Sequence, residues 1–71
     1  MYTEASASQW LGRWITVTVR EPSELVVGTL CHVSTRYAFV TEYGWDGPTV
    51  RRIPLEQIAD FTAVASIGTA G

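Results

Sequence analysis

The fold is decided by residues 13–61, which read RWITVTVREPSELVVGTLCHVSTRYAFVTEYGWDGPTVRRIPLEQIADF. Short runs rich in Val, Thr, Ile and aromatic residues alternate there with turns that contain Pro, Gly or Ser, which is the pattern of successive short β-strands. A one-turn helix is expected at 54–58, just before the last apolar run. We therefore predict an all-β fold, a small and strongly bent five-stranded barrel. Barrels of this size are far more often binding or assembly modules than enzymes.

The first predicted strand, 13–21, alternates cleanly, with Ile15, Val17 and Val19 on one face. The second strand, 25–33, carries Gly28 in its middle, and a glycine inside a strand marks a bulge or a sharp bend where the backbone packs closely. The remaining strands are expected at 36–43, 49–53 and 61–65, with turns at 21–24 and 34–35 and a loop at 44–48.

A short helix is predicted at 6–11, ahead of the first strand. Ser6 is its expected N-cap, Gln9 completes a capping box, and Gly12 ends it. Two helical turns are not stable alone in water, so Trp10 and Leu11 are expected to pack onto the barrel. We expect one domain over 1–71, with an ordered core at about 8–66 and a frayed tail at 67–71.

The composition predicts a thin core and self-association. The chain has 71 residues, 46% of them apolar, with one Cys and one His. An internal disulfide is therefore impossible, and we expect neither a metal site nor a cofactor. Oligomerisation is the remaining way to stabilise so small a domain, which predicts a homo-oligomer. A lone Cys and the lack of a basic leader favour a cytoplasmic protein, and no apolar run approaches the ~20 residues of a membrane span.

The charged residues argue against a general nucleic-acid binder. All five basic residues are Arg, against seven acidic residues, for a net charge of −2, whereas nucleic-acid binding draws on a basic surface. The absence of Lys indicates a GC-rich bacterial or phage genome. Arg51 and Arg52 are adjacent, and with Arg36 they form a candidate local patch. The alternative is that these arginines lie in solvent and pair with the acidic residues Glu42, Glu56 or Asp60.

No catalytic motif is present, and we predict that the protein is not an enzyme. Cys31 and His32 are neighbours in a strand, so their side chains point to opposite faces and cannot form a dyad. We expect Cys31 to be a small buried residue and His32 to lie at the surface. The phosphate-binding loop, the nucleophile elbow and the zinc-protease motif are all absent.

The aromatic residues carry the remaining functional signal. Tyr37, Phe39 and Tyr43 share one face of the third strand, and Trp45 follows in a Gly/Pro loop. This strip either faces the core or an oligomer interface, or forms a surface that stacks bases or holds a peptide. Trp45 is the best candidate for an exposed anchor, because Trp is enriched at interface hot spots; the alternative is that it folds back over the mouth of the barrel. The candidate binding residues are Tyr37, Phe39, Tyr43, Trp45, Arg36, Arg51 and Arg52.

The order of short helix, Gly12, Val/Thr-rich strand and Val26-x-Gly28-x-Leu30 resembles the Sm and Sm-like family of SH3-type barrels over about 10–64. SH3-like barrels also place a one-turn helix before their last strand, as Leu55–Ile58 would here. The resemblance implies a ring of six or seven subunits in which the fourth strand of one pairs with the fifth of the next. It also implies an RNA site, whose Asp and Asn positions hold Ser34 and Ala38 here. Its Arg-Gly pair is Arg51-Arg52, so only Arg51 matches.

Together these features predict a non-enzymatic small barrel that acts as a self-associating protein-interaction or assembly module, with a protein or peptide as a further partner. The alternative is a single-stranded nucleic-acid or nucleotide binder of the Sm-like ring type, using Arg36, Arg51 and Arg52 with the aromatic strip. The overall acidity disfavours that alternative.

Overall fold

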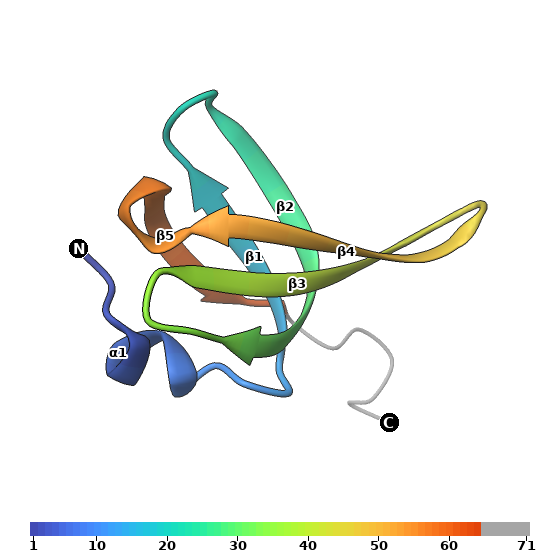
Figure 1. The fold of residues 1–71 in the computed structure, drawn as a ribbon. Coiled ribbons are helices and arrows are strands. Elements are labelled where there is room, and N and C mark those ends of the chain that lie inside the picture. The colour runs from blue at the N-terminus through green and yellow to red at the C-terminus, as the bar shows by residue number, and fades with distance from the viewer. Residues whose placement is uncertain (65–71) are drawn as a thin grey trace.

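The computed structural model describes residues 1–64. Its five strands form one antiparallel sheet in the order β4-β3-β2-β1-β5, so β4 and β5 are the edges (Figure 1). Part of the predicted last strand and the predicted tail at 67–71 lie outside the described residues. The elements are α1 (Glu4–Ser8), β1 (Trp14–Val19), β2 (Glu24–Val33), β3 (Tyr37–Gly44), β4 (Gly47–Pro54), a 3₁₀ helix η1 (Leu55–Gln57) and β5 (Ile58–Ala63).

The sheet curls around a single core. Ile15, Val17 and Val19 are buried along β1, as the alternation predicted. One cluster joins them to buried residues of α1, η1 and every other strand, which a flat sheet could not bring together. The members of this core are Ala7, Ile15, Val17, Val19, Val26, Leu30, Val33, Ala38, Val40, Ile53, Leu55, Ile58 and Phe61.

Gly28 marks a close approach between β2 and β3, as its place in the sequence predicted. It is buried between Val26 and Leu30. A Cβ added at Gly28 would overlap the backbone carbonyl oxygen of Thr41 and come within 2.9 Å of Cγ1 of Val40. The register of β2 against β3 is irregular further along, between Leu30 and His32, where it shifts by one residue. The sequence offered a close contact and a bulge as alternatives for Gly28. The structure has both, the close contact at Gly28 and the bulge between Leu30 and His32.

The β3–β4 connection is tighter than the predicted loop at 44–48. The ladder continues to the pair Gly44 and Gly47, which leaves only Trp45 and Asp46 in the turn. Gly47 has φ +102°, a conformation that costs a glycine little and that allows so short a reversal. The hairpin formed by β3 and β4 projects from the body of the molecule (Figure 1).

The N-terminal helix begins earlier than predicted. Thr3, not Ser6, is its N-cap: the Thr3 hydroxyl accepts a hydrogen bond from the Ser6 amide at 3.2 Å, and the Ser6 hydroxyl accepts one from the Thr3 amide at 2.8 Å. This reciprocal arrangement satisfies two amides at the helix start. Ala7 is the buried residue of the helix, while the predicted contact Leu11 is exposed. Gly12, with φ +77°, reverses the chain into β1.

Aromatic contacts hold the N-terminal segment against β5. The Trp10 ring stacks on Phe61 with 5.9 Å between centroids, and the Tyr2 ring meets Phe61 edge-on at 4.7 Å. The Tyr2 hydroxyl donates to Asp60 Oδ1 at 3.1 Å and accepts from the Phe61 amide at 3.3 Å. The one-turn helix before the last strand is confirmed as η1, and β5 starts immediately after it, at Ile58, three residues before the predicted start.

The contact at Gly28 gives the first testable prediction. Gly28→Val should lower the free energy of unfolding by at least about 2 kcal/mol, because its side chain must displace the backbone of β3. Gly28→Ala should also be destabilising, since a single Cβ already overlaps the Thr41 carbonyl. Gly44→Ala is the matched control, because a Cβ there meets nothing within 4 Å. Urea denaturation followed by fluorescence measures all three, and a Gly28→Ala curve as close to wild type as that of Gly44→Ala would contradict the account.

Candidate interaction surface

The side of the sheet that faces away from the core, here called the outer face, carries large apolar side chains. One cross-strand row runs through Trp14, Thr29, Thr41 and Val50 on four adjacent strands. None of these residues is charged. Threonines fill much of the face, and five large side chains on it are between 44% and 66% exposed, namely Trp14, Leu25, Val27, Tyr43 and Val50.

No described element covers the outer face. The described helix α1 places Ala7 in the core instead. The rings of Trp14 and Tyr43 lie 5.5 Å apart at their centroids, so the apolar residues of β1 and β3 touch across the sheet. A contiguous exposed apolar patch of this kind marks an interaction site more often than a plain surface.

The predicted aromatic strip lies on the outer face. Ala38 and Val40 occupy the core side of β3, so Tyr37, Phe39 and Tyr43 point outward, with Tyr43 59% exposed. The sequence left open whether the aromatic strip faces the core or the surface, and its outward direction excludes the core. The Phe39 ring lies 6.5 Å from Tyr37 and 5.3 Å from His32, so the strip continues onto β2.

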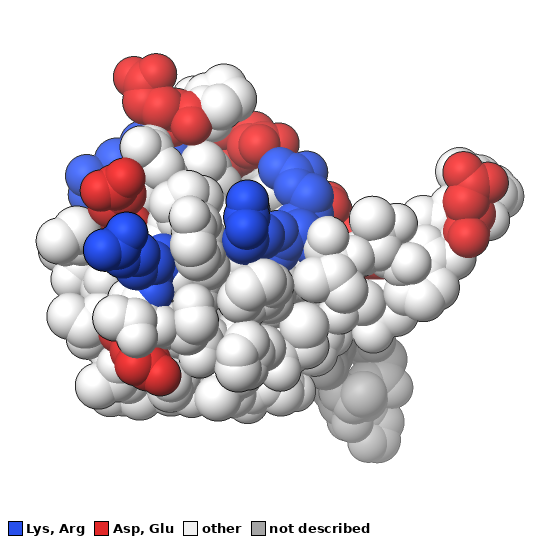
Figure 2. Space-filling view, viewed as in Figure 1, with Lys and Arg blue, Asp and Glu red and all other residues white. Residues whose placement is uncertain are grey.

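Trp45 stands at the end of the projecting hairpin and is as exposed as a tryptophan can be, at 105% of its reference surface. The expectation of an exposed side chain is thus confirmed. We call Trp45 and Asp46 the hairpin tip. Figure 2 shows acidic atoms at the end of the projection, where Asp46 is the acidic residue of the tip.

The three arginines of the predicted patch have different environments. Arg51 lies on the core side of β4 and is bound by two carboxylates, Glu24 at 2.7 Å and Glu42 at 3.3 Å. The pairing with Glu42 was one of the expected alternatives, whereas Glu24 was not foreseen. Arg52 points outward with its guanidinium 4.7 Å from the ring centroid of Tyr37. Arg36 is exposed and makes no ion pair with a described residue.

Cys31 is exposed, which contradicts the expectation of a buried thiol. Val26, Gly28 and Leu30 are buried on the core side of β2, so the alternation of the strand itself turns Cys31 outward, and its Sγ lies 3.2 Å from the Phe39 carbonyl oxygen. His32 is exposed as expected. Within residues 1–64, no three side chains of His, Cys, Asp or Glu are grouped so as to hold a metal ion. No described helix has the length and apolar character needed to cross a membrane.

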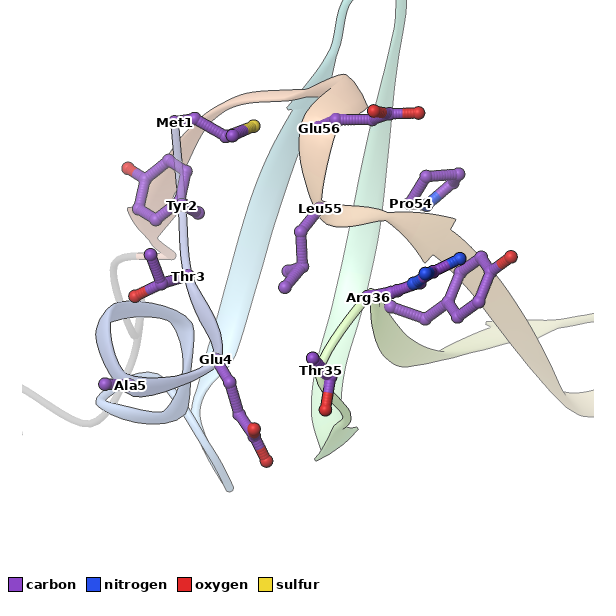
Figure 3. A pocket seen from close by; sticks show the side chains of 11 residues that line it. Met1, Tyr2, Thr3, Glu4, Ala5, Thr35, Arg36, Pro54, Leu55 and Glu56 are labelled. Carbon is purple, nitrogen blue, oxygen red and sulfur yellow. The ribbon is translucent and has the colours of Figure 1, made fainter.

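A groove of about 740 Å³ lies at the opposite end of the sheet from the hairpin tip. It separates the N-terminal segment from the start of β3 and from η1, and we call it the N-terminal groove (Figure 3). Among the predicted residues it contains Arg36 and Tyr37. Local sequence patterns could not indicate this groove, because its two walls come from segments some thirty residues or more apart.

Sequence reasoning also missed part of the outer face. Leu25 and Val27 flank the buried Val26, and Val50 precedes Arg51. A signal was present: three consecutive apolar residues at 25–27 place apolar side chains on both faces of a strand. In a sheet with one solvated face, strict alternation would be expected instead.

Comparison with protein-family models, with curated proteins and with solved structures finds no match to this chain. The candidate surface is therefore defined by the geometry and chemistry of its own residues.

The Arg51 ion pairs give a prediction about stability. A double-mutant cycle of Arg51→Met with Glu24→Gln should yield a coupling of about 0.5–1 kcal/mol, the range for partly exposed pairs. That coupling should shrink in 1 M NaCl, which screens exposed charges. The same cycle with Arg52→Met in place of Arg51→Met is the control and should give no coupling. Equal couplings for the two arginines in thermal denaturation would show that the pair is not formed.

Proposed function

We propose that this protein is a non-enzymatic, self-associating assembly module of the cytoplasm, built on a small SH3- or Sm-like barrel. Four features support the barrel: the strand order β4-β3-β2-β1-β5, the close contact at Gly28, the short N-terminal helix and the 3₁₀ turn before β5. The single core shared by all five strands also supports the barrel, because only a strongly curled sheet brings residues of all its strands into one core.

The observation that carries the proposed function is the uncovered outer face. Its five large side chains are each 44–66% exposed, and burying apolar surface is favourable by about 25 cal/mol per Å². A second copy of the chain is a suitable occupant, since the row from Trp14 to Val50 holds no charge that would be repelled or desolvated when the face meets itself. Contact with a copy would also supplement a core of only thirteen described residues, of which Phe61 is the one aromatic member.

The sheet edges offer a further means of assembly. β4 and β5 each pair with one described neighbour only, and unpaired edge strands form hydrogen bonds readily with another chain. Pairing of β4 in one copy with β5 in the next is the arrangement that the Sm-like resemblance implies. A protein or peptide that adds a strand at either edge would use the same backbone groups.

A non-enzymatic role accords with the described chemistry. Cys31 and His32 are adjacent but both lie at the surface, and the described acidic residues make salt bridges or lie in solvent. We propose that the protein requires neither a cofactor nor a metal.

Self-association is tested by mass in solution. At micromolar concentration, light scattering and native mass spectrometry should give a multiple of the 7.8 kDa chain mass. Val27→Glu should raise the dissociation constant at least about tenfold, equivalent to about 1.4 kcal/mol, because it places a charge on the outer face. Gln9→Glu, which adds the same charge at an exposed position after α1, is the control. A monomer mass for the wild type at every protein concentration from about 1 to about 500 µM would reject the proposal.

One observation favours the alternative of single-stranded nucleic-acid binding. Arg52 is exposed on β4 and Arg36 is exposed directly before β3, and the partly exposed rings of Tyr37 and Phe39 lie on β3. Cations beside aromatic rings are the elements of a base-stacking surface. Against this, Arg51 is neutralised by two glutamates, and Arg52 already covers one face of Tyr37.

The balance of charge leads us to expect only weak binding of oligonucleotides. Fluorescence anisotropy with short poly-U and poly-A strands should give dissociation constants no tighter than about 10⁻⁴ M at physiological salt, the non-specific range. Micromolar binding with a steep salt dependence, abolished by Arg36→Ala with Arg52→Ala but retained by Arg20→Ala, would establish the alternative instead.

A further inference from the structure

The hairpin tip presents an exposed indole on a fixed support. β3 and β4 remain paired as far as Gly44 and Gly47, so the turn that carries Trp45 is held from both sides. No described side chain covers the ring, which is 105% exposed. A tryptophan has one of the largest apolar surfaces of any side chain, and it is among the residue types enriched at interface hot spots.

The N-terminal groove has an apolar floor and fixed walls. Leu55 forms the floor: it is 4% exposed, and its side chain points into the space between the N-terminal segment and Arg36 (Figure 3). On one side, Tyr2 is held by its hydrogen bonds to Asp60 and Phe61. On the other, the Leu55 amide donates to the Arg36 carbonyl at 2.8 Å. The groove is therefore formed before any ligand arrives.

The tip cannot reach the groove of its own chain. Tyr37, which lines the groove, is the first residue of β3, and Trp45 directly follows its last residue. Eight residues of strand at about 3.4 Å each separate the two by roughly 27 Å, and Figure 1 shows the start of β3 and the β3–β4 turn at opposite ends of the sheet. An indole in the groove must come from another molecule.

The chemistry of the groove matches the hairpin tip. Its volume of about 740 Å³ is within the usual range for ligand pockets, about 300–1,000 Å³. Glu4 and Glu56 line it and can accept a hydrogen bond from the indole N–H. Arg36, which also lines it and has no described ion-pair partner, attracts Asp46. The two glutamates repel Asp46, so the tip enters in the orientation that places Asp46 beside Arg36.

We propose that the hairpin tip of one copy inserts Trp45 into the N-terminal groove of the next, with Asp46 against Arg36. This inference rests on the self-association proposed above and specifies one of its contacts. Because the tip and the groove are different surfaces at opposite ends of the chain, the contact is head-to-tail. Such contacts propagate, and they produce either a closed ring or an open filament.

The test uses two variants that each disable one side of the contact. Trp45→Ser removes the anchor but leaves the groove intact. Arg36→Glu places a carboxylate where Asp46 must lie but leaves the tip intact. Each variant alone should associate at least about tenfold more weakly than wild type in native mass spectrometry. Trp45→Phe keeps an aromatic ring but loses the indole N–H, so its association should be weaker than that of wild type and tighter than that of Trp45→Ser. Arg20→Glu, which makes the same charge change at another exposed arginine, is the control and should assemble as wild type does.

Mixing the two variants distinguishes a head-to-tail contact from a symmetric contact between two copies. The intact tip of the Arg36→Glu chain can enter the intact groove of the Trp45→Ser chain, and no further contact of this kind is then available. The mixture should therefore form one-to-one heterodimers, recognised by their mass, and nothing larger through this contact. A mixture that remains as dissociated as its two components would overturn the inference.

The remaining outcomes also decide between the two proposals. If Trp45→Ser assembles as tightly as wild type, the tip is not the contact, and the insertion is wrong while the assembly function stands. If the wild type is monomeric at every concentration, both proposals fail.

Discussion

The rest of the structure depends on the approach of the β2 backbone to β3 at Gly28. No side chain fits between Gly28 and the Thr41 carbonyl, so the two strands can be close there and the sheet can curl. The enclosed space is narrow as a result. Of the eight aromatic residues in the chain, Phe61 alone is buried, and the other core residues are Ala, Val, Ile and Leu. The aromatic side chains that do not fit inside are placed at the surface or around the N-terminal segment.

This placement links the fold to the proposed function. Trp14 and Tyr43 lie on the outer face, and Trp45 lies beyond the last residue pair of the β3–β4 hairpin. Exposed aromatic groups on regular strands lose little conformational entropy when they are buried by a partner, which makes them effective anchors. The acidic residues contribute differently: Glu24 and Glu42 neutralise Arg51, so the basic patch that nucleic acid would require is reduced to Arg36 and Arg52.

Local patterns predicted the strands well, and tertiary contacts account for the differences. The alternation at 15–19 and the position of Gly28 were sufficient for the core side of β1 and the close contact of β2. The helix start was misplaced because Thr3 and Ser6 both offer a capping hydroxyl. With Thr3 as the N-cap, the preceding Tyr2 contacts Asp60 and Phe61. Cys31 was misassigned because the expectation rested on the usual burial of Cys, although the alternation of Val26, Gly28 and Leu30 already placed it on the outward side of β2. The exposure of Trp45 was foreseen from its Gly/Pro surroundings, whereas the groove could not be, since it exists only once distant segments meet.

The central claim is that the exposed aromatic surface, and Trp45 above all, becomes buried between copies of the chain. The most direct measurement is ¹⁹F NMR of protein labelled with 5-fluorotryptophan, which gives one resonance for each of the three tryptophans, with Trp45 assigned from the Trp45→Phe variant. On concentration, the Trp45 resonance should move and lose its sensitivity to the exchange of H₂O for D₂O, while that of the half-buried Trp10 stays unchanged. A Trp45 resonance that remains fully sensitive to solvent in a sample whose mass shows assembly would contradict the account.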